Sequence, residues 1–160
     1  MDTPDEDLLN FWRSLNIFHV KYIMIGGFAV NLHGFSRMTA DVDIWLKDEM
    51  SNRRNLGKAL EQFGYGELSF DKLDFIPGWS NFYIGKGLNL DIITKMEGLP
   101  GISFDEALSK ANVAKIENIE VPFLNINQLI KNKKAINRPK DIVDVIELEK
   151  IINIRNQPEK

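Results

Sequence analysis

The first half of the chain shows two kinds of apolar periodicity, one typical of helices and one typical of strands. Over residues 5–17, apolar side chains recur at helical spacing behind an acidic first turn, which predicts an amphipathic helix. Residues 20–25 form a β-rich run that stops at Gly26 and Gly27, and residues 28–34 then predict a short helix. The glycine pair is therefore expected between a strand and a helix.

The middle of the chain is predicted to be rich in strands. Residues 41–46 predict a strand, and a helix is expected to follow over about residues 49–63. Further apolar or alternating runs, which favour short strands, occupy residues 74–76, 81–84 and 88–93. The Gly-Lys-Gly sequence between the last two runs indicates a hairpin.

The C-terminal third is predicted to be mainly helical. Ser103 is an N-cap candidate for a helix over residues 104–114, and two more helices are expected over residues 126–136 and 139–154. Between them, residues 119–123 contain a proline and predict a short edge strand. We expect an α+β fold: a mixed β-sheet with helices packed on one face and a C-terminal helical region that closes one side of a cleft.

Length and composition fit one globular domain. A chain of 160 residues, 44% apolar and 27% charged, is long enough to bury a core of ordinary size. We expect a single domain over residues 1–160, with a catalytic core over about residues 18–95 and the helical region over about residues 103–155.

Charge and cysteine content restrict the classes of function. The net charge of −3 argues against broad non-specific binding to nucleic acid. The absence of cysteine excludes disulfides and thiolate metal sites, and leaves oxygen ligands or the two histidines for any metal. The acidic N-terminus and the lack of a long apolar run predict a cytoplasmic protein with no membrane partner.

Three aspartates are the main candidates for chemistry. Asp41 and Asp43 are two positions apart in a predicted strand, so their carboxylates project from one face. Asp91 has a similar setting between apolar neighbours. If the two strands are adjacent, the three carboxylates repel one another unless a raised pKa, basic neighbours or a hard divalent ion neutralises them. Such a set suits phosphoryl transfer with two metal ions.

The glycine pair is expected to supply a phosphate site beside these acids. Gly26 and Gly27 allow a phosphate to approach backbone N–H groups, and the helix that follows presents its positive end. Arg37 and Thr39 lie between the glycine pair and the acids, where Arg37 is suited to stabilise charge on a phosphate. We assign nucleotide binding to these four residues.

The glycine pair, a gap of 13 residues and the Asp-Val-Asp-Ile run together resemble the signature of the polymerase-beta-like nucleotidyltransferase superfamily. Residues 37–43 look particularly similar to its small bacterial members, including abortive-infection and toxin–antitoxin nucleotidyltransferases. The resemblance implies two Mg²⁺ ions, with Mn²⁺ possible, held by Asp41, Asp43 and Asp91. It also implies a nucleoside triphosphate such as ATP at the glycine pair, transfer of a nucleoside monophosphate to an acceptor hydroxyl with release of pyrophosphate, and Asp91 as base.

Several alternatives stay open at this level. Asp71 and Asp74 compete with Asp91 for the third acidic position. Trp79 is expected in the core, with the lining of a pocket as its alternative. A basic cluster is either a solvated helix surface or a contact for triphosphate or RNA; it consists of Lys131, Lys133, Lys134, Arg138 and Lys140. The acceptor is a protein, an RNA or a small molecule. The rival to an enzyme is a regulatory or antitoxin-like module that binds a partner protein.

Overall fold

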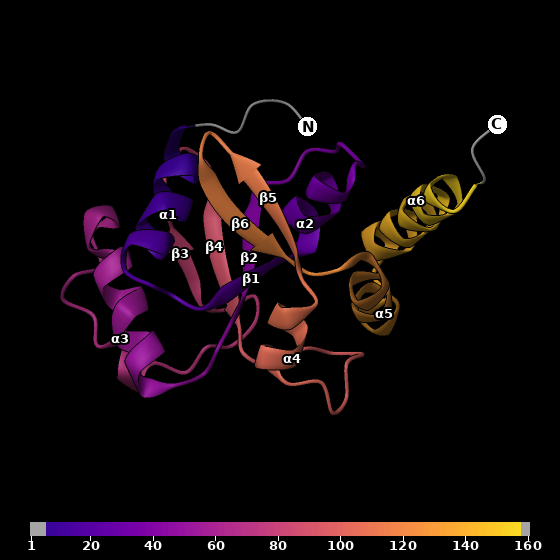
Figure 1. The fold of residues 1–160 in the computed structure, drawn as a ribbon. Helices are drawn as coiled ribbons and strands as arrows, with labels where there is room; N and C mark the ends of the chain where they lie inside the picture. Colours follow the sequence, from indigo (N-terminus) through magenta and orange to yellow (C-terminus); the bar gives the residue numbers. More distant parts are fainter. Residues whose placement is uncertain (1–5, 158–160) are drawn as a thin grey trace.

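A computed structural model describes residues 6–157, and the strands in that range form one six-stranded sheet (Figure 1). The strands are β1 (Tyr22–Ile25), β2 (Asp41–Leu46), β3 (Asn81–Tyr83), β4 (Asn89–Ile93), β5 (Asn112–Ile116) and β6 (Ile119–Phe123). The helices are α1 (Glu6–Ile17), α2 (Gly26–His33), α3 (Met50–Ala59), α4 (Phe104–Ser109), α5 (Ile126–Ile136) and α6 (Pro139–Arg155), with short 3-10 helices η1 (Glu61–Phe63) and η2 (Phe70–Lys72).

The sheet is mixed, as the sequence predicts. Its strand order is β3-β4-β2-β1-β6-β5. β2 runs parallel to β4 and antiparallel to β1, and β1 in turn is parallel to β6. β3 and β4 pair in antiparallel fashion, which confirms the hairpin predicted from the Gly-Lys-Gly sequence. The predicted α+β class is therefore confirmed.

The helices link the sheet to a C-terminal helical pair. α1 contacts α3 and β6, while α2 packs on β1 and β2 and also contacts α5 and α6. Figure 1 shows α5 and α6 side by side, on the far side of α2 from α1 and α3. The apolar face of α1 is fully buried, with Phe11 and Trp12 both 0% exposed. No helix within residues 6–157 is both long enough and apolar enough to span a bilayer.

Three local predictions were wrong. Residues 74–76 form no strand, because the preceding chain turns through η2 and leads into a loop. The helix expected over residues 104–114 ends at Ser109, although Ser103 does cap it by accepting a hydrogen bond from the Glu106 N–H. The third error is the helix expected over residues 49–63, which ends at Ala59 and continues as η1.

The strand β5 explains why the helix stops early. Residues 112–116 pair with β6 across a two-residue turn, Glu117 and Asn118, in which both residues have positive φ. Such a turn matches the twist of a hairpin, and cross-strand pairing here outweighs the helical propensity of the segment. Because β5 takes the outer position, the prediction that residues 119–123 form an edge strand was also wrong.

Candidate active site

Sheet register brings the three predicted acids to one place. In the parallel pair of β2 and β4, Asp43 lies directly opposite Asp91, and Asp41 lies opposite Asn89. Residues in register share a face because the pleats of neighbouring strands are aligned. The condition set by the sequence, that the two acidic strands be adjacent, is therefore met. Asp71 and Asp74, the competing acids, lie outside both strands.

Within residues 6–157, no basic side chain forms an ion pair with the carboxylates on this face, although the charges of Lys133 and Lys140 act to lower the pKa of Asp43. Burial raises the pKa of Asp43 to about 6, and the charges of Asp91 and Asp41 add to the rise. Burial also raises the pKa of Asp91, against the opposing effect of the Gly78 N–H. Both shifts have the direction expected where like charges are crowded and partly desolvated. The site therefore gains from any positively charged ligand.

Asp91 is held by a neighbouring turn. The backbone N–H of Gly78 donates to both carboxylate oxygens of Asp91, at 3.1 and 3.0 Å. In the part of the chain that the structure describes, no three acidic or histidine side chains are gathered closely enough to bind a metal ion. The carboxylates nevertheless suit a hard divalent ion by their chemistry, since Mg²⁺ prefers oxygen donors.

The glycine pair forms the first turn of α2 rather than a loop before it. Gly26 has φ +67°, and a Cβ at this position would overlap the Oδ2 atom of Asp43. At Gly27, a Cβ would lie 2.8 Å from the Thr39 Oγ1 and 3.2 Å from the Arg37 Nη1. Both positions therefore require glycine for close packing: Gly26 against the acidic strand, and Gly27 against the segment that leads into it.

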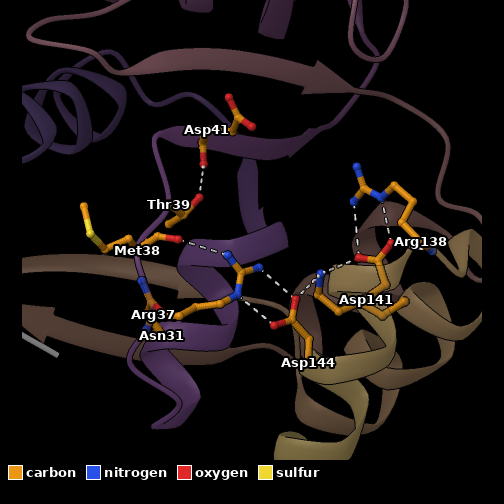
Figure 2. Close-up of polar contacts among 9 residues, drawn as sticks. Asn31, Arg37, Met38, Thr39, Asp41, Arg138, Asp141 and Asp144 are labelled. Atoms are coloured by element: carbon orange, nitrogen blue, oxygen red, sulfur yellow. Dashed lines mark hydrogen bonds and ion pairs between the residues drawn. The ribbon is translucent and has the colours of Figure 1, made fainter.

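Arg37 and Thr39 make contacts within the protein (Figure 2). The Nε and Nη2 atoms of Arg37 donate to the two oxygens of Asp144, at 2.7 and 2.8 Å, and Nη1 donates to the Met38 carbonyl. The Thr39 hydroxyl donates to the Asp41 carbonyl at 3.3 Å. Arg37 thus ties the segment before β2 to α6, while its contact with a phosphate stays a prediction.

A buried ion network fixes α5 to α6. Lys133 Nζ lies 2.9 Å from Asp141 Oδ1 and 2.9 Å from Asp144 Oδ2, and Arg138 Nε lies 2.7 Å from Asp141 Oδ2. Both aspartate side chains are 0% exposed. Burial alone would raise the pKa of Asp141, but Arg138 and Lys133 outweigh it and lower that pKa to about 2. We call Arg37, Lys133, Arg138, Asp141 and Asp144 the ion network.

The structure divides the basic cluster into different roles. Lys133 is buried in the ion network, whereas Lys134 pairs with Glu149 at the surface. Lys140 and the half-exposed Arg138 line the cleft. Neither structural aspartate of α6 was singled out in the sequence. The only signal was their spacing, three and six residues after Arg138, which also fits an ordinary solvated helix.

The acids and the cations face the same cleft. It has a volume of about 550 Å³. One wall comes from the sheet and the turn beside it, and includes Gly26, Asp41, Asp43, Pro77, Gly78, Asn81 and Asp91. The opposite wall comes from the C-terminal helical pair and the residues at its start, and includes Asn132, Lys133, Ile136, Arg138 and Lys140. Such a cleft suits a ligand that carries both bound cations and negative charge.

Comparisons with known proteins identify the fold. No protein-family model matches this sequence, and a search of curated proteins finds no match. Among solved structures, the lincosamide antibiotic adenylyltransferase LnuA, with lincomycin bound, aligns with a TM-score of 0.62 at 15% identity, over 94% of this chain and 99% of that one. ANT(2'')-Ia in complex with adenylyl-2''-tobramycin aligns with a TM-score of 0.57 at 16% identity, over 92% of each chain.

A third structure supports the same assignment. A putative nucleotidyltransferase from Thermotoga maritima aligns with a TM-score of 0.54 at 17% identity, over 92% of this chain and 91% of that one. The chain therefore has the nucleotidyltransferase fold. At these identities the likeness concerns the fold, and the assignment of activity depends on the site itself.

Proposed function

We propose that this protein is a metal-dependent nucleotidyltransferase that moves a nucleoside monophosphate from a nucleoside triphosphate to an acceptor hydroxyl. The observation that carries the proposal is that Asp43 lies in register with Asp91, while Asp41 precedes Asp43 by two residues on the same strand. All three line one wall of a cleft whose other wall is cationic. Acidic residues that face cations across an open cleft suit a ligand made of phosphates and divalent ions. The nucleotidyltransferase fold supports this choice.

Asp41, Asp43 and Asp91 would hold two Mg²⁺ ions, or Mn²⁺. When bound, these ions neutralise the triphosphate and stabilise charge at the reacting phosphorus. The triphosphate would lie across Gly26 at the start of α2, where backbone N–H groups and the helix dipole favour negative charge. Gly27, Arg37 and Thr39 belong to the proposed nucleotide site through their packing around this turn.

The cationic wall suits the part of the nucleotide that leaves. Lys140 and Arg138 line the cleft together with the acids, and both residues are exposed. We place the β- and γ-phosphates there. The acceptor oxygen forms a bond to the α-phosphorus, the bond from that phosphorus to the bridging oxygen breaks, and its electron pair leaves with pyrophosphate. Asp91 is positioned to take the proton of the acceptor hydroxyl.

A small molecule is the acceptor class that the structural neighbours favour. One of these neighbours has lincomycin bound, and another is in complex with adenylyl-2''-tobramycin. We further propose that residues 1–160 act as one domain, in which residues 18–95 carry the chemistry and residues 103–155 close the cleft.

The test is thermal unfolding with and without Mg²⁺ plus each of the four common nucleoside triphosphates. Wild type is expected to gain stability only when ion and nucleotide are both present, because the acids otherwise repel the triphosphate. Asp43→Asn should lose that gain together with release of pyrophosphate. Asp74→Asn is the matched control, because Asp74 lies on an exposed loop outside the acidic strands. Equal nucleotide affinity in excess chelator would refute the metal site.

A partner-binding module predicts the opposite pattern. In that case, Asp43→Asn would leave complex formation unchanged, and no nucleotide would raise the unfolding temperature of wild type. Transfer activity is measured separately, by following the label of α-labelled nucleotide into candidate acceptors.

A further inference from the structure

Trp79 is the exception among the tryptophans. Trp12 is 0% exposed and Trp45 is 3% exposed, as expected for core residues, but Trp79 is 84% exposed, so the expectation that it lies in the core was wrong. An indole ring is a large apolar surface with one polar atom, which makes it a frequent site of ligand contact when it is left in solvent. The position of this ring therefore decides what it can do.

The turn that carries Trp79 is firmly built. Its backbone N–H donates to the Ile76 carbonyl at 2.9 Å, and the Ile76 N–H donates to the Ser80 hydroxyl at 2.9 Å. Asn81 Nδ2 donates to the Gly78 carbonyl at 2.9 Å, and the Gly78 N–H is bonded to Asp91. These hydrogen bonds fix the backbone of the turn and therefore the direction in which the Trp79 side chain leaves it.

The turn that carries Trp79 lies beside Asp91, the proposed base. Gly78 and Asn81, on either side of Trp79, both line the cleft, and Gly78 contacts Asp91 directly. Trp79 itself does not line the cleft, so its exposed indole lies outside it, one residue along the turn from Gly78. The turn is on the β3–β4 side of the cleft, whereas Arg138 and Lys140 are on the side of the C-terminal helices.

The geometry of phosphoryl transfer assigns the β3–β4 side of the cleft to the acceptor. Attacking and leaving oxygens lie roughly in line on opposite sides of the phosphorus. If pyrophosphate leaves toward Arg138 and Lys140, the acceptor hydroxyl must approach from the side of Asp91. Asp91 is also the group placed to take its proton. The first surface next to that approach path is the turn that carries Trp79.

We propose that Trp79 is the acceptor-binding residue of this site and that it stacks on a flat ring of the acceptor, so that the acceptor is a ring-bearing alcohol. The inference rests on the proposed function, because it uses the direction in which pyrophosphate leaves. It adds the substrate class, which neither the acids nor the glycine pair determines. Aromatic stacking is selective for flat rings over flexible chains of similar size.

The experiment compares two reactions of the enzyme: transfer of the nucleoside monophosphate to an added alcohol and its transfer to water. Wild type, Trp79→Ala and Trp79→Phe are incubated with Mg²⁺, ATP and either benzyl alcohol or the acyclic 1-hexanol, and the ratio of nucleotide ester to free nucleoside monophosphate is measured. The ratio cancels changes that affect both reactions equally. Ile154→Ala is the control, since Ile154 is also exposed, at 67%, but lies near the end of α6.

Wild type should favour benzyl alcohol over 1-hexanol by about threefold to tenfold, the range that aromatic stacking gives. Trp79→Ala should lose this preference, whereas Trp79→Phe and Ile154→Ala should retain it. A wild type without the preference, or a Trp79→Ala variant that keeps it, would overturn the inference.

A second measurement needs no turnover and separates this inference from the proposed function. Because Trp12 and Trp45 are buried, acrylamide quenches mainly the fluorescence of Trp79. Benzyl alcohol should protect that fluorescence in the wild type, and 1-hexanol at the same concentration should not. If benzyl alcohol protects the Trp79 fluorescence but no nucleotide is transferred, only the proposed reaction is refuted. Transfer without ring selectivity or protection would sink only the role of Trp79.

Discussion

Two pairs of aspartates in this protein have opposite electrostatic surroundings. Asp43 and Asp91 lie side by side on neighbouring strands, and burial and mutual repulsion raise the pKa of each. Asp141 and Asp144 on α6 are both 0% exposed, yet cations lower the pKa of both. Burial alone does not explain the difference, because it raises the pKa of all four carboxyl groups. The difference comes from the basic side chains that form ion pairs with Asp141 and Asp144.

The comparison distinguishes structural acids from functional ones. In the ion network, Lys133 and two arginines satisfy the carboxylates, so the fold gains from their charge. On the sheet, the charge is left without such partners at a cost to stability, which is the usual situation of a site prepared for a ligand cation. Changes that neutralise each group should therefore shift stability in opposite directions.

The largest effect is expected from Asp144→Ala. This change removes the partner of Arg37 and one of the two partners of Lys133, whose side chain is only 3% exposed. Breaking a buried pair leaves an uncompensated charge and costs about 3–5 kcal/mol of unfolding free energy. Urea unfolding measures the loss. Glu149→Gln is the control, because its pair with Lys134 is exposed and should change stability by less than about 1 kcal/mol.

Similar losses in these two variants would contradict the structural role of the ion network. They would show that Asp144 is no more coupled to its cations than a surface acid is.

An intermediate effect is expected from pH at Asp141. Its folded pKa of about 2 lies below the usual value of 3.8, so the stability it contributes is present above about pH 4 and is lost as pH falls toward 2. The shift corresponds to about 2 kcal/mol. Asp141→Asn should therefore be less stable than wild type at pH 6, and the gap should narrow by about that amount at pH 2. A gap that stays constant with pH would contradict the ionic role.

The smallest effect, with the opposite sign, is expected from Asp43→Asn without metal. The folded protein disfavours the ionised form of Asp43, so a neutral side chain of the same shape should leave stability unchanged or raise it by about 1 kcal/mol at pH 7.5. Thermal unfolding in chelator measures this change. A clear loss of stability would mean that Asp43 has a cationic partner in the fold and belongs with the structural acids.

The sequence predicted the elements whose burial follows a simple local pattern. Residues 41–46 and 126–136 have the predicted boundaries, because one alternates strongly and the other carries a regular apolar face. β5 was missed because its residues are compatible with either state, and its strand form depends on pairing with β6. Local pattern does not contain that information.

The predicted site shows the same limit. Spacing in a strand was enough to align Asp41 with Asp43, and the apolar setting of Asp91 was enough to propose it as their neighbour. In contrast, the sequence did not single out Asp144, because its partner Arg37 is 107 residues away. The exposure of Trp79 was also beyond reach, since it depends on the turn that bonds to Asp91.

The distance in sequence between Arg37 and its partner Asp144 has a consequence for synthesis on the ribosome. The glycine pair, the acidic strands and Arg37 all emerge before α6, the helix that carries Asp141 and Asp144. Chains fold from the N-terminal side as they appear, at roughly 5–20 residues per second. A nascent chain thus holds Arg37 without its anchor Asp144, which lies 107 residues further on, for roughly 5–20 seconds, and Lys133 without its two carboxylates for about a second. The cationic wall of the cleft is therefore completed last, after the acids that it faces.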